Sequence, residues 1–414
     1  MTAGVKTIRE VSIGVYDGPH ATPELHDEGA AVFLGIPNLL PDGRIDVTAA
    51  RWVAERDLAK WTRRVTPQPN DIVFTYEATL NRYAIIPEGF RCCLGRRTAL
   101  IRPDPFQIDH RFLFYYFFSP TWRAQIEANT LTGATVDRIP LTTFPEFEVL
   151  VPTLEEQKRI AEVLSAYDDL IATNQRRIAL LEDAARRLYR EWFVHLRFPG
   201  HEQVEVKDGV PQGWQQGSAH DFISILSGGT PKTGVEHYWG GDIPFFTPKD
   251  SPDAYYVLGT EKTLTETGLA SCNSRLFAKN TTFITARGTV GKVALAQRPM
   301  AMNQSCYALK PKQEYHDLFL FAAIKDAVEH FKQVAVGGVF DAIVVDTFKV
   351  IPFVLPEAEV TKAFGNAVQP LFQQVETLLL QNQQLAQARD LLLPKLMSGR
   401  LDVSGIRLPE EMAA

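Results

Sequence analysis

Residues 154–197 read LEEQKRIAEVLSAYDDLIATNQRRIALLEDAARRLYREWFVHLR and contain neither proline nor glycine. From Ile160 to Trp192 the residues of one stripe, nearly all of them apolar, recur at alternating steps of four and three. Such steps keep one stripe on one side of an α-helix, and four heptads of them are typical of a coiled-coil seam. A helix from Ile160 to Trp192 would span roughly 48 Å.

A second stripe with the same phase lies 204 residues later in the chain. The first predicted seam comprises Ile160, Leu164, Tyr167, Ile171, Asn174, Ile178, Leu181 and Leu188; the second comprises Phe364, Val368, Leu371, Val375, Leu378, Asn382, Leu385 and Leu392. Each seam contains one asparagine, and a single buried asparagine commonly fixes the register and the partner of a coiled coil. The alternative is two unrelated amphipathic helices, each covering a globular core.

The segments before these helices are also repeated. Gly133–Asp137 resembles Gly337–Asp341 at a separation of 204 residues, and Asn70–Thr75 resembles Asn280–Thr285 at 210. Thr22-Pro23 likewise recurs 208 residues later as Thr230-Pro231. A period near 200 residues indicates an internal duplication, with two globular domains that are each followed by a long helix.

The composition is that of a globular protein with two cores, since 45% of the 414 residues are hydrophobic. Binding to phosphates depends on lysine and arginine, so a net charge of −6 predicts only modest binding of DNA by this chain alone. The four cysteines show no metal-ligand spacing, which indicates reduced thiols and, without a signal or transmembrane segment, a cytoplasmic protein.

Each globular domain reads as mixed α/β. Short apolar runs bounded by turn residues predict its strands. They are 32–36, 71–75, 83–86 and 99–101 in the first domain, and 243–246, 282–285, 293–295 and 307–309 in the second. A helix is expected over Phe112–Ile126, its aromatic residues in the core, and another over Asp317–Phe331. Pro41-Asp42-Gly43 predicts a turn, because proline presets φ and glycine permits a positive φ.

Four segments give the chain its resemblance to type I restriction–modification DNA specificity subunits, over essentially its whole length. They are LSGGTPKTG at 226–234, ARGTVGKVAL at 286–295, LEEQKRIAEVLSAYDDLI at 154–171 and LLLPKLMSGRL at 391–401. YDGPHATP at 16–23 is similar to the start of many first recognition domains of that family. Their order and duplication are more specific than any one of them.

The resemblance implies an α/β (mixed α+β) fold with two pseudo-repeated target-recognition domains, separated by two long helices that form an antiparallel coiled coil. The implied domains are 1–152 and 199–356, the helices 153–198 and 357–400, and the tail 401–414. Each domain would read one half of a bipartite target in double-stranded DNA. The helices would dock two methyltransferase subunits, which would hold S-adenosylmethionine, and restriction (translocase–nuclease) subunits would join through them. The chain itself would be non-catalytic and would bind neither cofactor nor metal.

The enzymatic motifs that could argue otherwise are incomplete. Gly288-Thr-Val-Gly-Lys292 suggests a P-loop, but that motif needs a further glycine where Ala286 stands and a hydroxyl residue where Val293 stands. The nine histidines show no HExxH and no paired metal-ligand spacing. Neither nucleotide binding nor metal catalysis is therefore expected.

The candidate DNA contacts are residues whose side chains pair with base edges or phosphates and that stand in predicted loops or strand ends. They are His20, Thr22, Asn38, Arg44, Asn81, Arg82, Arg96 and Arg97 in the first domain, and Thr230, Lys232, Lys249, Arg287, Lys292, Asn303 and Gln304 in the second. Some belong to motifs shared by family members with different targets, so they could instead maintain the fold or contact phosphates. Glu77 stands where the second domain has Arg287, so the halves are expected to read different sequences.

Two other functions remain open. The chain could be a homologous recognition module of another modification or defence complex, or a duplicated coiled-coil scaffold that has no role on DNA. A scaffold would enrich no split motif from random DNA.

Overall fold

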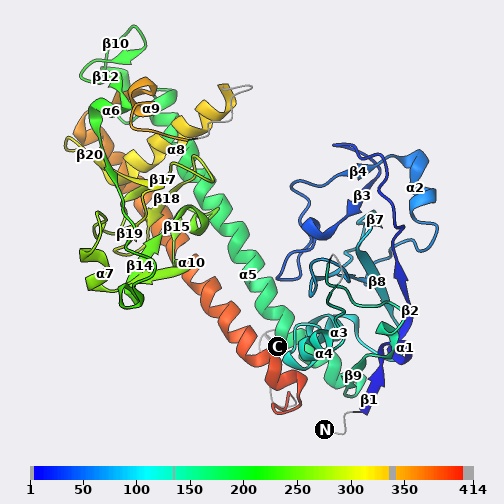
Figure 1. The fold of residues 1–414 in the computed structure, drawn as a ribbon. Coiled ribbons are helices and arrows are strands. Elements are labelled where there is room, and N and C mark those ends of the chain that lie inside the picture. Colours follow the sequence, from blue (N-terminus) through cyan, green and yellow to red (C-terminus); the bar gives the residue numbers. More distant parts are fainter. Residues whose placement is uncertain (1–3, 134–135, 335–341, 404–414) are drawn as a thin grey trace, which may run out of the picture. The chain divides into compact units, whose positions relative to one another are not determined.

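The computed structural model describes residues 4–133, 136–334 and 342–403 (Figure 1). The chain divides into two compact units. Unit 1 comprises Met1–Leu170 with Leu385–Ala414, and unit 2 comprises Ile171–Gln384. Each unit therefore contains one globular domain together with a part of each of the two long helices.

Within the residues that the structure describes, unit 1 contains one larger sheet of four strands and two smaller sheets. Its strands are β1 (Gly4–Thr7), β2 (Ser12–Asp17), β3 (Ala31–Leu34), β4 (Trp52–Val53), β5 (Ile72–Thr75), β6 (Tyr83–Ile85), β7 (Cys92–Leu94), β8 (Thr98–Pro103) and β9 (Glu148–Val151). The sheet orders are β2-β8-β5-β6, β4-β3-β7 and β1-β9. The helices are α1 (Ile8–Val11), α2 (Glu55–Trp61), α3 (His110–Tyr116) and α4 (Pro120–Ala128), with 3-10 turns η1 (Ile36–Asn38) and η2 (Phe144–Glu146).

Unit 2 repeats this plan. Its strands are β10 (Val206–Lys207), β11 (Val210–Pro211), β12 (Gln215–Ser218), β13 (Ile223–Ser227), β14 (Trp239–Phe246), β15 (Tyr256–Val257), β16 (Lys262–Leu264), β17 (Thr282–Thr285), β18 (Val293–Ala296), β19 (Ala301–Met302), β20 (Cys306–Pro311) and β21 (Pro352–Leu355). The sheet orders are β13-β20-β17-β18-β15, β16-β14-β19, β12-β21 and β10-β11. The helices are α6 (Ala219–Phe222), α7 (Glu266–Ala270), α8 (Asp317–Val334) and α9 (Thr347–Val350), with 3-10 turns η4 (His201–Gln203), η5 (Glu236–Tyr238) and η6 (Pro248–Asp250).

The two domains share their hydrogen-bond pattern, which confirms the predicted duplication. The Thr75 amide donates to the Arg82 carbonyl, as the Thr285 amide does to the Lys292 carbonyl, both at 3.0 Å. β3 pairs with β7 in parallel, as β14 does with β19. Asn70 and Asn280, which open equivalent strands, both adopt positive φ. The repeated sequence therefore encodes the same turn and the same strand pairing twice.

The expected single helix over Phe112–Ile126 is wrong. Unit 1 has two short helices there, because the chain leaves the helix after Tyr116 and starts again at Pro120. The Ser119 hydroxyl caps the second helix, and proline at its first position cannot continue a preceding helix. The expected core role of the aromatic residues is confirmed, since Phe112 and Phe117 are fully buried.

The predicted long helices are present with slightly different ends. The first, α5, is α-helical over Leu154–Tyr189 and ends in a π-turn at Arg190–Val194. The second, α10, covers Ala358–Met397. Thr153 and Glu156 form the capping box before α5 that their spacing indicates. None of the predicted seam residues is exposed.

Two hydrogen bonds join Glu182 of α5 to Tyr255, which precedes β15 in the five-stranded sheet of unit 2. The Tyr255 amide donates to the Glu182 carboxylate at 2.7 Å, and the Tyr255 hydroxyl donates to the Glu182 carbonyl. Lys325 lies over the Tyr255 ring, 5.4 Å from its centroid. Burial raises the pKa of Glu182 to about 7, although the Tyr255 amide and the nearby Lys325 both lower it.

We expect the stability of unit 2 to fall as the pH rises from about 4.5 to 7. The folded-state pKa of Glu182 lies above its ordinary value of 4.5, so the protonated carboxyl stabilises the folded form. This stabilisation is lost as the carboxyl ionises between about pH 4.5 and 7. The loss is on the order of 2–3 kcal/mol. Glu182→Gln should abolish this pH dependence of the urea unfolding midpoint, because the amide oxygen still accepts from Tyr255. The exposed control Glu236→Gln should keep it; a persistent pH slope in Glu182→Gln would contradict the assignment.

Candidate nucleic-acid interface

A hollow of about 400 Å³ lies at the small sheet of unit 2. It is lined by the loop after β13, the η6 turn, the start of β16 and the turns before β18 and β20. The lining residues are Thr230, Thr233, Trp239, Phe245, Thr247, Pro248, Lys249, Asp250, Glu261, Lys262, Arg287, Gly288, Asn303 and Ser305. Four predicted DNA contacts from four separate segments (Thr230, Lys249, Arg287 and Asn303) thus come together here. Below, "the unit 2 hollow" means this site.

Two glycines let the loop after β13 approach two other segments closely: Gly228 faces the turn before β20, and Gly229 faces residues 273–274. A Cβ added at Gly228 would lie 2.2 Å from the Met302 carbonyl oxygen, and one at Gly229 would lie 2.8 Å from the Asn273 amide. No side chain fits at either distance. The close approach allows the Thr230 hydroxyl to donate to the Gln304 side-chain carbonyl. The glycines of the LSGGTPKTG motif therefore position the two predicted residues Thr230 and Gln304.

The turn between β17 and β18 presents Arg287 to solvent. Gly288 and Gly291 adopt positive φ there, and the Arg287 amide donates to the Ser305 carbonyl. Arg287 is exposed and forms no ion pair with any residue that the structure describes. Lys292 differs, because its ammonium group pairs with Asp253 at 2.5 Å. Arg287 is thus the cation of this turn that remains available to a ligand.

The opposite wall carries Lys249 and a lysine that the sequence analysis did not select. Asp250 accepts hydrogen bonds from the Thr247 amide and the Glu261 amide, which fixes the η6 turn and leaves Lys249 exposed. Lys262 lies over the Trp239 ring, 5.5 Å from its centroid. Three cationic side chains therefore border the unit 2 hollow: Lys249, Lys262 and Arg287. It has two acidic side chains, Asp250 and Glu261, and Asp250 holds the η6 turn.

Unit 1 builds the equivalent turns, but more of its charge is paired internally. A Cβ at Gly18 would lie 2.5 Å from the Gly95 carbonyl oxygen, as at Gly228 in unit 2. Arg97 lies 3.4 Å from Glu77, the residue at the position of Arg287. His20 lies 2.9 Å from Asp17. The exposed positions of this region therefore carry less uncompensated positive charge than the unit 2 hollow.

The remaining candidates of unit 1 differ in their exposure and in the contacts that they make. Thr22 and Arg96 are exposed. Asn81 adopts positive φ and accepts from the Tyr83 hydroxyl, and one Arg82 guanidinium nitrogen is buried without a partner in the described residues. Arg44 pairs with Asp42 in the turn that follows η1.

Asn38 has a structural use in this fold. Its carbonyl oxygen accepts from the Gly35 amide at 3.0 Å, and its amide donates to the Asp46 carbonyl. Asp250 has the same capping role in η6. Asn38 therefore holds its own turn, and its side chain is not turned outward to a ligand.

Comparison with known proteins gives the same assignment as the motifs. Residues 41–183 and 211–387, more than half of the chain, match the family described as "Type I restriction modification DNA specificity domain". The chain belongs to this family. Its function is that of a specificity subunit, which recognises a DNA target for a type I restriction–modification system.

Relatives in the specificity-subunit family match different shares of the chain. The MjaIX specificity subunit of Methanocaldococcus jannaschii is 31% identical over 154 residues, 36% of either chain. The HindI specificity subunit of Haemophilus influenzae is 23% identical over 73% of this chain and 80% of its own. The crystal structure of a type I S subunit from M. genitalium is 17% identical, covers 96% of both chains and gives a TM-score of 0.57, which supports the fold.

The sequence of this specificity-family chain did not predict Trp239, Lys262 or Glu261 in the unit 2 hollow, nor its three hydroxyl residues Thr233, Thr247 and Ser305. Trp239 and Lys262 meet only because β14 pairs with β16, which places Phe245 opposite Lys262. Nothing in the local sequence around Trp239 indicates Lys262 as its partner.

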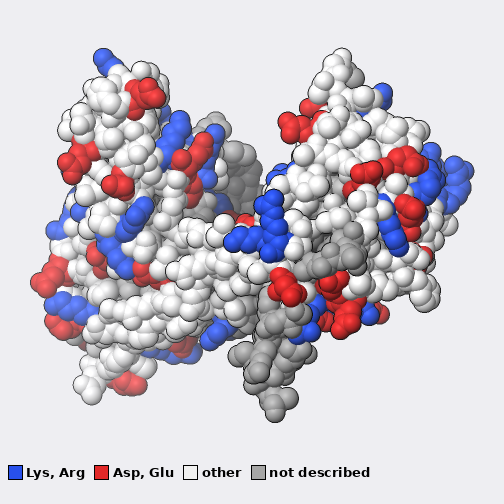
Figure 2. Space-filling model, turned by 90° about the horizontal axis from the view of Figure 1, so that it is seen from below, with Lys and Arg blue, Asp and Glu red and all other residues white. Residues whose placement is uncertain are grey.

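The face that Figure 2 draws carries side chains of both charges, with broad uncharged areas between them. Lysine and arginine are interspersed there with aspartate and glutamate among the residues it colours. Within the described residues, no helix is both long and apolar enough to cross a bilayer, and no three histidine, cysteine or acidic side chains are grouped as metal ligands.

Proposed function

We propose that each globular domain of this specificity subunit reads one half of a bipartite DNA site. The proposed readers are 1–152 and 199–356. The observation that supports this is the repeated glycine-held loop and turn, which in one domain presents Arg287 and in the other a Glu77–Arg97 pair. Arginine donates two hydrogen bonds to guanine, whereas a paired carboxylate does not present the same donors. The two half-sites therefore differ in sequence.

We further propose that the helices 153–198 and 357–400, followed by the tail 401–414, pair as an antiparallel coiled coil. In unit 1, Ile160 near the start of α5 shares a core with Leu396 near the end of α10. In unit 2, Asn174 donates to Asn382 at 2.9 Å, and Ala185, later in α5, shares a core with Phe364, earlier in α10. The contacts in unit 1 and those in unit 2 both support antiparallel pairing. Shifting one helix by a heptad along the other would move one half-site relative to the other by about 10 Å.

We expect the asparagine pair of the seam to fix the register. Asn174→Leu alone should lower the free energy of unfolding by about 1–3 kcal/mol, because it leaves the half-buried Asn382 amide without its partner. Asn174→Leu with Asn382→Leu should recover that loss and relax the register. A double-mutant cycle on urea midpoints measures the coupling; a double variant less stable than both single variants would contradict the pairing.

The partners of the proposed complex follow from this division of roles. Two methyltransferase subunits would dock on the helices, bind S-adenosylmethionine and flip the target adenine, so that this chain performs no catalysis itself. Restriction subunits would join through them. The exposed pair Arg176-Arg177 on α5 and the glutamine-rich surface of α10 would serve for docking. Arg186 and Arg187, which the sequence also suggests for this role, are less available because both pair with Asp183.

Selection from a random duplex pool tests the proposal. The full chain with its methyltransferase subunits should enrich two short motifs that are separated by a fixed spacer of unspecified sequence. A single uninterrupted motif would exclude two separate readers, and no motif would favour the scaffold alternative. The methyltransferase subunits without this chain are the control and should enrich nothing.

A further inference from the structure

The two domains differ at one place where their sequences are aligned without a gap. In unit 2 the segment after Pro252-Asp253 forms β15, the fifth strand of the large sheet, with Tyr256 paired to Leu295. In unit 1 the segment after Pro41-Asp42 turns back at Gly43, which has a φ of +90°, and the large sheet stops at four strands. The same Pro-Asp pair therefore precedes a strand in one copy and a tight turn in the other.

Tyr255, the residue just before this extra strand, places its aromatic side chain in the interior of unit 2. The Tyr255 ring packs edge-on against Phe321, with 4.9 Å between centroids, and in a tilted arrangement against Phe372, with 5.2 Å between centroids. Its exposed fraction is 4%. The cavity left around it measures about 10 Å³. Tyr255 thus fills the space between α8, α5 and α10 of its unit.

Unit 1 has no such residue. Arg44 stands at the position of Tyr255, and its guanidinium is paired with Asp42 in the turn, 2.7 Å away. The turn is closed by the Leu40 amide, which donates to the Arg44 carbonyl, and by a bridge from Leu39 to Ile45. No aromatic side chain from this segment enters the space beside α3.

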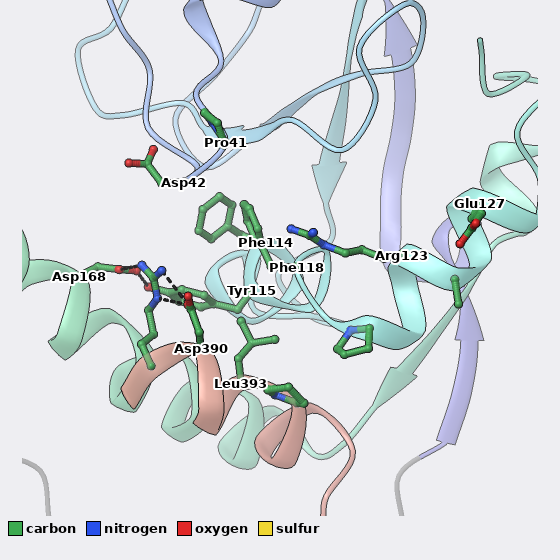
Figure 3. Close-up of a pocket in the computed structure, with 14 residues that line it drawn as sticks. Pro41, Asp42, Phe114, Tyr115, Phe118, Arg123, Glu127, Asp168, Asp390 and Leu393 are labelled. Carbon is green, nitrogen blue, oxygen red and sulfur yellow. Dashed lines mark hydrogen bonds and ion pairs between the residues drawn. The ribbon is translucent and has the colours of Figure 1, made fainter. Parts of the chain in front are cut away.

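A hollow of about 700 Å³ remains in unit 1 where Tyr255 lies in unit 2 (Figure 3). Tyr115 and six other lining residues occupy positions equivalent to residues around Tyr255, and the counterpart of Tyr115 is Ala322. The other six are Phe114, Phe118, Asp168, Arg389, Asp390 and Leu393, and their counterparts in the same order are Phe321, Lys325, Phe372, Ala185, Arg186 and Tyr189. "The unit 1 hollow" below means this space.

The charges in the unit 1 hollow are mostly satisfied. Asp168 accepts from the Tyr115 hydroxyl at 2.5 Å and from Arg389, which also pairs with Asp390. Arg123 and Glu127 of α4 form no ion pair with any described residue, and Figure 3 shows the Arg123 side chain extending toward Phe118. The unit 1 hollow therefore combines apolar lining residues such as Phe114, Phe118 and Leu393 with hydrogen-bonding groups such as Arg123.

We propose that the unit 1 hollow binds a tyrosine or phenylalanine side chain of a partner polypeptide, in the place that Tyr255 fills in unit 2. An aromatic anchor in a pocket, ringed by polar groups, is a common centre of protein interfaces. Tyr255 shows which occupant this framework accepts, and Arg123 adds a donor for a hydroxyl or carboxylate beside the ring. The site is distinct from the unit 2 hollow and does not depend on DNA recognition.

Saturation-transfer NMR with millimolar p-cresol, the side-chain analogue of tyrosine, tests the site in the full chain. The unaltered chain should show transfer to p-cresol. Ala124→Trp places a ring in the hollow and should weaken binding at least tenfold, whereas Ala128→Trp, one turn later on α4 and outside it, should not. Tyr255→Ala should open the counterpart in unit 2 and increase the signal. No transfer with the unaltered chain, or equal transfer with Ala124→Trp, would overturn the proposal.

A peptide library displayed on phage tests the polypeptide part. Selection on the full chain should enrich peptides with tyrosine or phenylalanine that p-cresol displaces and that bind Ala124→Trp at least tenfold more weakly. Peptides without an aromatic residue, or aromatic peptides that bind both chains equally, would overturn it. Circular dichroism of both tryptophan variants checks that the fold is retained.

Discussion

Arg287→Ala is expected to remove selection at one half-site and leave the other unchanged. The guanidinium lies exposed at the unit 2 hollow and forms no ion pair with a described residue. All of its N–H donors are therefore available to a ligand. A bidentate contact with guanine contributes about 1–3 kcal/mol, which corresponds to roughly 5- to 150-fold in affinity. Selection from a random duplex pool, with the methyltransferase subunits present, measures the change for each half-site separately.

A salt titration distinguishes the two possible contacts of Arg287. If the side chain meets a phosphate, Arg287→Ala should weaken all sequences equally and reduce the slope of log affinity against log salt by about 1. If it reads a base, the preference at one position should disappear with little change in slope. Arg298→Ala is the matched control, because Arg298 is also exposed in unit 2 and lies outside the hollow. An unchanged motif and affinity in Arg287→Ala would remove this residue from the interface.

The long helices could be predicted because their signal is local. A stripe with steps of four and three identifies the buried face of α5, and its proline- and glycine-free run gives its length. The end was less predictable, since the π-turn at Arg190–Val194 follows residues with the same apolar pattern. The break between α3 and α4 was missed, although Ser119-Pro120 is a recognisable helix start.

The pairing of the strands could not be predicted from local sequence. Pro41-Asp42 and Pro252-Asp253 are identical pairs with different outcomes. Gly43 permits the tight turn in the first copy, while β15 in the second copy exists only through its contact with Leu295, far along the chain. The hollow in one domain and the buried Tyr255 in the other both result from this difference.

The candidate site divides in the same way. Residue type and turn position were enough to select Thr230, Lys249, Arg287 and Asn303, which the fold brings together. Residue type and turn position could not indicate which charged side chains form ion pairs within the protein. Lys292 pairs with Asp253, 39 residues away, and that partner is set by tertiary structure. Which of these residues contact DNA stays a prediction, and the Arg287 experiments address the first of them.

Gly228→Ala should disable the second reader, since the added methyl group has no space. Its Cβ would lie 2.2 Å and 2.3 Å from two backbone carbonyl oxygens, of Met302 and Asn303, and backbone atoms cannot turn aside as a side chain can. We expect the loop to be displaced, with a loss of about 3 kcal/mol in the stability of that domain. Thr230 would then lose its contact with Gln304, and selection at the second half-site should disappear.

Gly18→Ala provides the reciprocal test in the first domain, where the Cβ would lie 2.5 Å from the Gly95 carbonyl oxygen. It should abolish selection at the first half-site and preserve the second, the reverse of Gly228→Ala. Gly234→Ala is the control, because its Cβ would meet no atom within 4 Å. Urea unfolding and duplex-pool selection on all three variants provide the measurements. Loss of both half-sites in either variant would mean that the two domains do not read DNA independently, since a steric change confined to one turn has no other route to the second reader.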